Sequence, residues 1–199
     1  MNQPKVFLVG GAPGAGKTTL GRALAARLGK ASLSLDDVFS AVLAVTTRES
    51  HPGLHAMGGR TAAEYFTTTE VEQLQADATL QHEAMWPPAQ KVIRNHATWG
   101  SPMVIDGWFL RPDRVARLDL ERVRPLWLVV DPPVLEARER ANAGFFGNAV
   151  DPERMLRNFL ARSLWFNDLI AREAGALGMK ILRQDGSASV DDLCARALD

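Results

Sequence analysis

The chain has 199 residues, 46% of them hydrophobic and 23% charged, which is ordinary for a soluble globular protein and predicts one domain over 1–199. The formal net charge is zero and no apolar run approaches the ~20 residues that span a bilayer, which argues against nucleic-acid binding and against a membrane partner. One cysteine, Cys194, excludes an intrachain disulfide, and only five mostly polar residues precede the first apolar run, so we expect a cytoplasmic protein without a signal peptide.

The first elements in chain order are a buried strand over 5–9 and a helix over 16–28 that ends at Gly29. The segment between them fits the pattern G-x-x-x-x-G-K-[ST], whose fixed positions fall on Gly11, Gly16, Lys17 and Thr18. Glycines let backbone N–H groups wrap an anion, and the following helix N-terminus adds partial positive charge. A glycine-rich turn with an incidental lysine is the ordinary alternative, but the strand–loop–helix context disfavours it. We therefore predict a nucleoside triphosphate site.

The next stretch contains a short strand and a long helical region. A strand over 31–35 precedes a helical stripe, and the glycine-rich segment 46–59 is typical of an irregular loop. Thr69 and Glu72 have the spacing of a capping box, which predicts a helix to about residue 85. The Pro87–Pro88 pair then predicts the start of a second helix that runs to about residue 98.

Strands and helices alternate through the rest of the chain. The predicted strands are 103–107, 126–131 and 179–182, and the predicted helices are 112–122, 132–141, 152–176 and 189–198. This alternation predicts a three-layer α/β P-loop NTPase fold, with a five-stranded parallel sheet flanked by helices. We expect an acceptor-binding helical insertion at about 46–100 and a short lid at about 142–155.

Carboxylates follow two of the predicted strands at the edge where such sheets bind ligands. Asp106 ends an apolar strand and is predicted to hold Mg²⁺ directly or through water, although an aspartate there also suits a helix N-cap. Asp36 follows the strand over 31–35, which we expect to lie beside the first strand. Its carboxylate can accept a proton from an acceptor hydroxyl, with Asp37 as its helper; a helix cap is the alternative.

Arginines after the strand over 126–131 are candidates for phosphate binding, because a guanidinium neutralises a transferring phosphoryl group. Surface ion pairs with nearby glutamates are the alternative for each of them. These candidates are Arg138, Arg140, Arg154, Arg157 and Arg162.

Three residues are candidates for the acceptor side of the site. Arg111 follows the stretch that begins at Asp106, where it can bind an anionic acceptor or pair with Asp113, and both readings stay open. Trp108 is the tryptophan that we expect to line the acceptor pocket. Arg60 lies by the loop at which folds of this type admit their second substrate.

Several segments resemble known P-loop kinases. The segment 104–108 (VIDGW) resembles adenylate kinases, and 35–39 (LDDVF) resembles chloramphenicol phosphotransferase, whose base falls on Asp36 here. The segments 7–14 (FLVGGAPG) and 158–162 (NFLAR) are similar to the family of 2-phosphoglycerate kinases. The chain thus resembles the group that includes adenylate, gluconate and shikimate kinases.

This resemblance implies ATP with Mg²⁺ as the phosphoryl donor and a lid arginine at Arg138. It also implies that a short run of loop residues surrounds the phosphates, with Lys17 on the β- and γ-phosphates and Thr18 on the metal. That run is Gly14, Ala15, Gly16, Lys17, Thr18 and Thr19.

The leading hypothesis is a kinase that transfers the γ-phosphoryl group to a hydroxyl of a small molecule, acting as a monomer or homodimer. The alternatives are an ATPase that serves as a regulatory module and a polynucleotide kinase, which the neutral charge disfavours. The acceptor stays open. A phosphorylated acid would need cations such as Arg60, Arg111 and Arg162, whereas an apolar, antibiotic-like acceptor would use Trp108.

Overall fold

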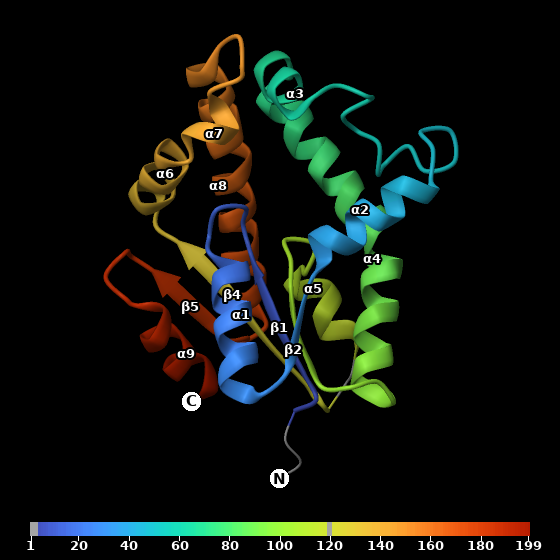
Figure 1. The fold of residues 1–199 in the computed structure, drawn as a ribbon, viewed down its shortest axis with the longest axis vertical. Coiled ribbons are helices and arrows are strands. Elements are labelled where there is room, and N and C mark those ends of the chain that lie inside the picture. Colours follow the sequence, from blue (N-terminus) through green and yellow to red (C-terminus); the bar gives the residue numbers. More distant parts are fainter. Residues whose placement is uncertain (1–3, 119–120) are drawn as a thin grey trace.

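A computed structural model describes residues 4–118 and 121–199, in which five strands form one sheet (Figure 1). The strands are β1 (Val6–Gly11), β2 (Ala31–Ser34), β3 (Met103–Asp106), β4 (Val123–Val130) and β5 (Ile181–Gln184). The helices are α1 (Lys17–Leu28), α2 (Leu35–Val45), α3 (Ala62–Thr68), α4 (Val71–Thr98), α5 (Pro112–Val115), the 3-10 turn η1 (Ala116–Leu118), α6 (Pro132–Ala141), α7 (Ala143–Phe146), α8 (Pro152–Ala176) and α9 (Val190–Leu198).

The strand order is β2-β3-β1-β4-β5 and every pair is parallel, which confirms the predicted five-stranded parallel sheet. The expectation that the second strand lies beside the first is wrong, because β3 lies between them. The burial pattern explains this order: every residue of β1 is buried, whereas β2 is short and partly exposed. A short, partly exposed strand suits the edge of a sheet, and an apolar strand suits its centre.

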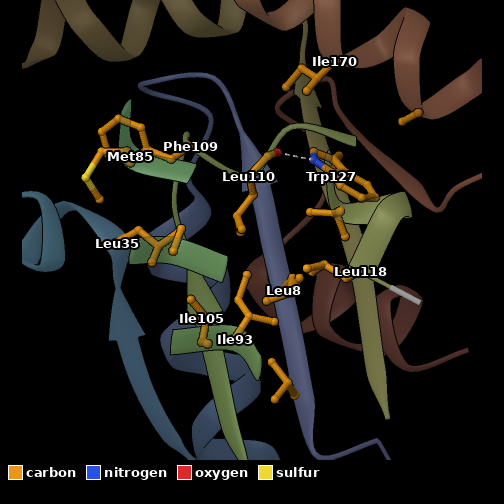
Figure 2. Packing of buried hydrophobic residues seen from close by; sticks show 14 of the residues in the cluster. Leu8, Leu35, Met85, Ile93, Ile105, Phe109, Leu110, Leu118, Trp127 and Ile170 are labelled. Atoms are coloured by element: carbon orange, nitrogen blue, oxygen red, sulfur yellow. Dashed lines mark hydrogen bonds between the residues drawn. The ribbon is translucent and has the colours of Figure 1, made fainter. Parts of the chain in front are cut away.

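Two hydrophobic cores lie on opposite faces of the sheet, because alternate side chains of β1 point in opposite directions. Val6 and Leu8 join the core formed with α4 and α8, and Phe7 and Val9 join the core formed with α1 and α9. Figure 2 shows the first core, in which the indole Nε1 of Trp127 donates a hydrogen bond to the backbone oxygen of Leu110 at 2.8 Å. That bond ties the loop after β3 to β4.

The second core contains the C-terminal helix. Cys194 on α9 is 1% exposed and packs in the same cluster as Leu20 and Leu24 of α1. Ser189 caps α9 through a capping box with Asp192, as expected for a helix that begins after residue 189.

The prediction of two helices separated at Pro87–Pro88 is wrong, since α4 runs unbroken through both prolines. Each internal proline removes a backbone hydrogen bond. An uninterrupted buried stripe along α4 compensates for this loss: it packs Met85, Ala89 and Ile93 into the first core. Tertiary packing therefore overrides the local signal.

The predicted capping box at Thr69 and Glu72 is also wrong. The N-cap of α4 is Glu70, and its side chain makes no capping hydrogen bond. A capping box does occur one helix earlier, where Thr61 and Glu64 begin α3, a helix that the sequence patterns did not predict.

Other predicted elements are present with shifted ends. β4 begins at Val123, and β5 covers Ile181–Gln184 rather than 179–182. The helix predicted over 112–122 is α5 followed by η1, which ends at Leu118, and residues 119–120 lie outside the described residues. Within the described part of the chain, no helix is long and apolar enough to cross a membrane.

Candidate active site

The glycine-rich loop joins the central strand β1 to helix α1 at the carboxyl edge of the sheet. Gly14 and Gly16 have φ angles of 79° and 93°, a region that side chains other than glycine rarely adopt. Gly16 is the N-cap of α1 and has no side chain with which to cap the first turn. The first N–H groups of α1 therefore remain available to an anion.

Lys17 lies folded back across this loop and is only 7% exposed. Its ammonium Nζ donates a hydrogen bond to the backbone oxygen of Ala12 at 2.9 Å. Burial lowers the pKa of Lys17, and the carboxylates of Asp36, Asp106 and Glu139 oppose this effect. The ammonium group thus points at the loop, with three carboxylates near enough to stabilise its charge.

The side chains of Thr18 and Asp106 are joined by a direct hydrogen bond. The Thr18 hydroxyl donates to Oδ2 of Asp106 at 2.8 Å, and the register of β3 against β1 pairs Asp106 with Val9 just before the loop. Asp106 is 1% exposed, and its Oδ1 has no hydrogen-bond partner. Burial raises the pKa of Asp106, while the Thr18 hydroxyl and Lys17 oppose that rise.

A hydroxyl and a carboxylate are the oxygen ligands that Mg²⁺ prefers. The unpartnered Oδ1 of Asp106 fits such an ion, since a buried carboxylate oxygen without a partner is costly. Among the described residues no group of three or more histidine, cysteine or acidic side chains could hold a metal by itself. An ion at Thr18 and Asp106 would need further oxygen ligands from water or a phosphate.

Asp36 lies in the first turn of α2 and not at the end of a strand, because β2 ends at Ser34 and the fully buried Leu35 begins the helix. Its backbone N–H donates to the Ser34 hydroxyl at 3.3 Å. The carboxyl is open to solvent, yet surrounding protein atoms partly desolvate it and raise its pKa; Lys17 opposes this shift and Asp37 adds to it. The structure therefore brings Asp36 near Lys17 and Asp106.

Arg138 on α6 packs against the backbone of the glycine-rich loop. Its NH1 donates to the backbone oxygens of Ala15 at 3.3 Å and Gly14 at 3.5 Å, and its NH2 donates to Oε1 of Gln184 at 3.2 Å. A hollow of 390 Å³ adjoins these groups. It is lined by Gly14, Gly16, Thr19, Leu20, Arg138, Gln184, Ala188, Val190 and Leu193. Its place beside the loop suits the nucleoside part of a nucleotide.

Sequence reasoning missed two buried polar residues of this region. Gln184 ends β5 and positions Arg138; a polar residue at a strand's carboxyl end is the signal that could have found it. Glu139 is 7% exposed and lies against Gly14, where a Cβ atom would come within 2.3 Å of its Oε1. Burial raises the pKa of Glu139, and Asn142, Lys17 and Arg138 oppose this effect.

Arg162 lies on α8 inside an aromatic cage and is 9% exposed. Its guanidinium carbon is 4.6 Å from the ring centroid of Phe66, 5.0 Å from that of Trp108 and 5.6 Å from that of Phe159. It forms no salt bridge with any described carboxylate, and its Nε has no hydrogen-bond partner. Burial lowers the pKa of Arg162 to about 10. The structure thus brings together Trp108 and Arg162, which the sequence analysis assigned to alternative classes of acceptor.

The other arginine candidates divide by their partners. Arg111 pairs with Glu173 and, through Nε at 3.3 Å, with Asp113, so the ion-pair alternative describes its state here. Arg140 pairs with Glu136 and Glu153, and Arg154 pairs with Glu70, all near the surface. Arg60 is exposed and forms no salt bridge with a described residue.

His82 is a further residue that sequence reasoning missed. It is 2% exposed on α4, its ring is 4.4 Å from that of Trp108, and its Nε2 has no partner. Burial holds the pKa of His82 well below its ordinary value, and the nearby cations Arg111, Arg162, Arg114 and Lys17 act in the same direction. Its position on the buried stripe of α4 is the signal that could have identified it.

The parallel sheet, the loop and the Thr18–Asp106 pair define an α/β protein of the P-loop NTPase fold. Residues 6–150 match the family model AAA_33, described as an AAA domain, and the chain belongs to this family. No curated protein matches the chain closely enough to count as a relative.

Solved structures share the fold over almost the whole chain. A gluconokinase from Sinorhizobium meliloti has a TM-score of 0.58 at 16% identity, covering 100% of this chain and 91% of its own. A shikimate kinase from Bacteroides thetaiotaomicron has 0.53 at 19% identity, covering 97% and 94%. A shikimate kinase from Acinetobacter baumannii, solved with shikimate, has 0.50 at 17% identity, covering 99% and 92%. The fold of the P-loop small-molecule kinase group is therefore confirmed.

Proposed function

We propose that the protein is an ATP-dependent kinase that transfers the γ-phosphoryl group of ATP to a hydroxyl of a small anionic acceptor. The observation that carries this proposal is the convergence of the phosphate-binding loop with the carboxylate of Asp36, which forms no salt bridge with a described residue. A kinase needs both: a cradle for the triphosphate and a carboxylate that can take the acceptor proton. The named activities of the structural neighbours agree with this class, but at their low identities they support only the fold.

In this proposal each loop residue has a defined task. Lys17 and the first N–H groups of α1 hold the β- and γ-phosphates, and Arg138 packs beside the nucleoside. Mg²⁺, when bound by Thr18 and Asp106, would neutralise charge on the β- and γ-phosphates. Asp36 orients the acceptor hydroxyl and accepts its proton as the oxygen attacks the γ-phosphorus, whose bond to the bridging oxygen breaks so that ADP leaves. Catalysis is then mostly positioning and charge neutralisation.

The anionic class of the acceptor follows from Arg162. Burying a guanidinium away from water costs several kcal/mol when no carboxylate pairs with it. Cation–π contacts with Phe66, Trp108 and Phe159 each return only about 0.5–2 kcal/mol. A buried charge that destabilises the empty protein is expected at a binding site, where the ligand supplies the missing counter-ion. A carboxylate or phosphate group of the acceptor is the natural counter-ion for Arg162.

The test is an acceptor screen with ATP and Mg²⁺, followed by mass identification of the product. Hydroxy acids and phosphorylated hydroxy acids are compared with neutral polyols and with apolar, antibiotic-like alcohols. We expect ADP release only with anionic acceptors, and no turnover by Lys17→Ala. ATP hydrolysis that is independent of any acceptor would instead favour the ATPase alternative, and transfer to neutral acceptors alone would exclude the anionic class.

The variant Arg162→Met distinguishes a role of Arg162 in acceptor binding from a role in the stability of the fold. Because methionine fills the aromatic cage without a charge, the variant should melt at or above the temperature of the parent. Its KM for the acceptor should rise by about 100-fold, as expected for the loss of a charge-assisted contact, while the Kd for ATP is unchanged. A lower melting temperature with an unchanged acceptor KM would mean that Arg162 is a structural residue.

A further inference from the structure

Two arginines that form no salt bridge with a described carboxylate flank one aromatic pair on α3. The guanidinium carbon of Arg60 is 4.9 Å from the ring centroid of Tyr65, and that of Arg162 is 4.6 Å from the ring centroid of Phe66. The two rings meet edge to face, with 5.3 Å between centroids. Arg60 comes from the loop before α3 and Arg162 from α8, so α3 is the element that both cations share.

A buried acid lies behind this aromatic pair. Asp77 on α4 is 8% exposed, and its Oδ2 accepts a hydrogen bond from the Tyr65 hydroxyl at 2.7 Å. Its Oδ1 accepts a second bond from Nε2 of Gln73, also at 2.7 Å. Among the described residues no cation forms a salt bridge with Asp77. Hydrogen bonds alone therefore satisfy this buried carboxylate.

The Tyr65 hydroxyl, and not an arginine, occupies Oδ2 of Asp77. A carboxylate in direct contact with Arg60 or Arg162 would occupy the guanidinium donors and leave them unable to bind a ligand. Because Asp77 binds the Tyr65 hydroxyl instead, the acid fixes the ring beneath Arg60 without contacting the guanidinium itself. Burial and the hydrogen bond to Asp77 raise the pKa of Tyr65, so its hydroxyl stays a donor.

The same residues fix the position of α3. Tyr65 ties α3 to α4 through Asp77, and Asn158 ties α3 to α8 by donating to the backbone oxygens of Phe66 at 2.8 Å and Thr69 at 3.1 Å. Arg60 is held over the Tyr65 ring by its bond to the backbone oxygen of Met57 at 2.9 Å. Any displacement of α3 would therefore move the aromatic supports of both arginines.

We propose that Tyr65 and Asp77 are positioning residues that hold Arg60 and Arg162 ready for the anionic acceptor. This inference rests on the proposed function, because it assigns the two arginines to the acceptor. Asp77 fixes Tyr65 through the hydrogen bond to its hydroxyl, and Tyr65 transmits the restraint without blocking the guanidinium donors. Neither residue touches the reacting atoms.

The test uses the full-length protein and two variants that remove different parts of the unit. Tyr65→Phe keeps the ring and removes the hydroxyl, and Asp77→Asn keeps the size and removes the charge. The probes are malonate and inorganic phosphate, titrated calorimetrically with and without ATP and Mg²⁺. We expect the Kd of the anionic probe to rise about tenfold in each variant, while the Kd for ATP stays within about twofold. With a working acceptor, KM should rise by the same factor and kcat should change little.

Gln73→Met is the matched control. It removes a hydrogen bond of equal length from the other oxygen of Asp77 but does not touch Tyr65, so the anion Kd should stay within about twofold of the parent value. Equal weakening by all three variants would mean that they only loosen the packing of α3 on α4, and would overturn the proposal.

Comparison with Arg162→Met separates this inference from the proposed function. Loss of anion binding in Arg162→Met, with parental affinity in Tyr65→Phe and Asp77→Asn, would overturn the positioning role and leave the proposed function standing. Parental affinity in Arg162→Met would overturn both.

Discussion

Asp106 and Lys17 are almost excluded from solvent, at 1% and 7% exposure, and burial disfavours the charged form of each. Their mutual attraction and the Thr18 hydroxyl offset part of that cost. A nucleotide with a divalent cation would supply the missing partners on both sides. In the proposed function, the buried charges of Lys17 and Asp106 would thus lower the stability of the empty chain and be compensated by the ligand.

A pH-dependent stability difference follows for Asp106→Asn. The pKa of Asp106 is raised above 3.8 in the folded chain, so at pH values just above 3.8 the folded chain binds more protons than the unfolded chain. The free energy of unfolding therefore falls as the pH rises from 3.8 through the raised pKa. The neutral amide lacks this effect. We expect Asp106→Asn to be the more stable protein at about pH 7, with the difference shrinking as the pH falls toward 3.8.

Denaturant midpoints measured across this pH range check the expectation. Asp131→Asn removes a carboxylate just after strand β4, on the far side of β1 from β3, and corrects for the general effect of losing one acidic group. A less stable Asp106→Asn at neutral pH would mean that the contacts with Thr18 and Lys17 outweigh the cost of burial.

Asp36→Asn tests the acid–base assignment. The amide keeps the shape of the side chain but cannot accept the acceptor proton, so phosphoryl transfer should fall by about 10²–10⁴-fold. Calorimetric binding of ATP with Mg²⁺ should stay close to the parent value, because Lys17, Thr18 and Asp106 are unchanged. Transfer at the parent rate would remove Asp36 from the mechanism.

At the scale of elements, α4 is the helix whose continuity the sequence obscured. Pro87 is exposed within it and prevents a backbone hydrogen bond to the oxygen of Glu83. Pro87→Ala should restore this bond and stabilise the protein by about 1–3 kcal/mol, less the entropy that alanine returns to the unfolded chain. The denaturation midpoint measures the change, and Thr79→Ala, on an earlier turn of α4, controls for general effects of substitution in this helix. A lower midpoint would show that the proline shape itself is required.

The sequence predicted correctly those elements whose local residue pattern directly reflects their position in the fold. The apolar strands β1, β3 and β4 were found because burial on both faces leaves a continuous apolar run, and α9 was found because Ser189 suits the N-cap of a helix. The order of β2 and β3 was not accessible, since it depends on which strand is the better edge. The unbroken course of α4 depends on contacts with residues far away in the sequence.

The site was predicted to a similar degree. The loop, Thr18 and Asp106 follow from local motifs at strand ends, and the structure brings them together. Tyr65 and Asp77 gave no local signal, because a tyrosine and an aspartate on separate helices acquire meaning only when α3 packs on α4. Such tertiary pairs lie beyond any reading of a single sequence.

At the scale of the whole molecule, the candidate site lies at the carboxyl edge of the sheet, and Figure 1 shows α3 and α7 at the end opposite the N-terminus. A nucleotide that binds the folded chain and not the unfolded chain stabilises the fold. The free energy of unfolding should therefore rise by about 2.7 kcal/mol when ATP, with Mg²⁺ present, reaches 100 times its Kd. For a chain of 199 residues this corresponds to a rise in Tm of about 5–10 °C.

Thermal melts with ATP alone, Mg²⁺ alone and both together provide the measurement. The shift should be largest with both and should vanish in Lys17→Ala, whose ammonium is absent. The same rise in Tm in Lys17→Ala would show that the nucleotide binds elsewhere on the molecule.

The single cysteine of the chain is shielded by α9 and α1, and burial raises the pKa of the Cys194 thiol. An alkylating reagent can therefore modify the thiol only while the C-terminal helix is detached. The labelling rate of the natural protein reports how often this end of the molecule opens, without any introduced probe. Because Val190 and Leu193 of α9 line the hollow beside the loop, a nucleotide bound there should slow that labelling, so the same thiol reports whether the hollow is occupied.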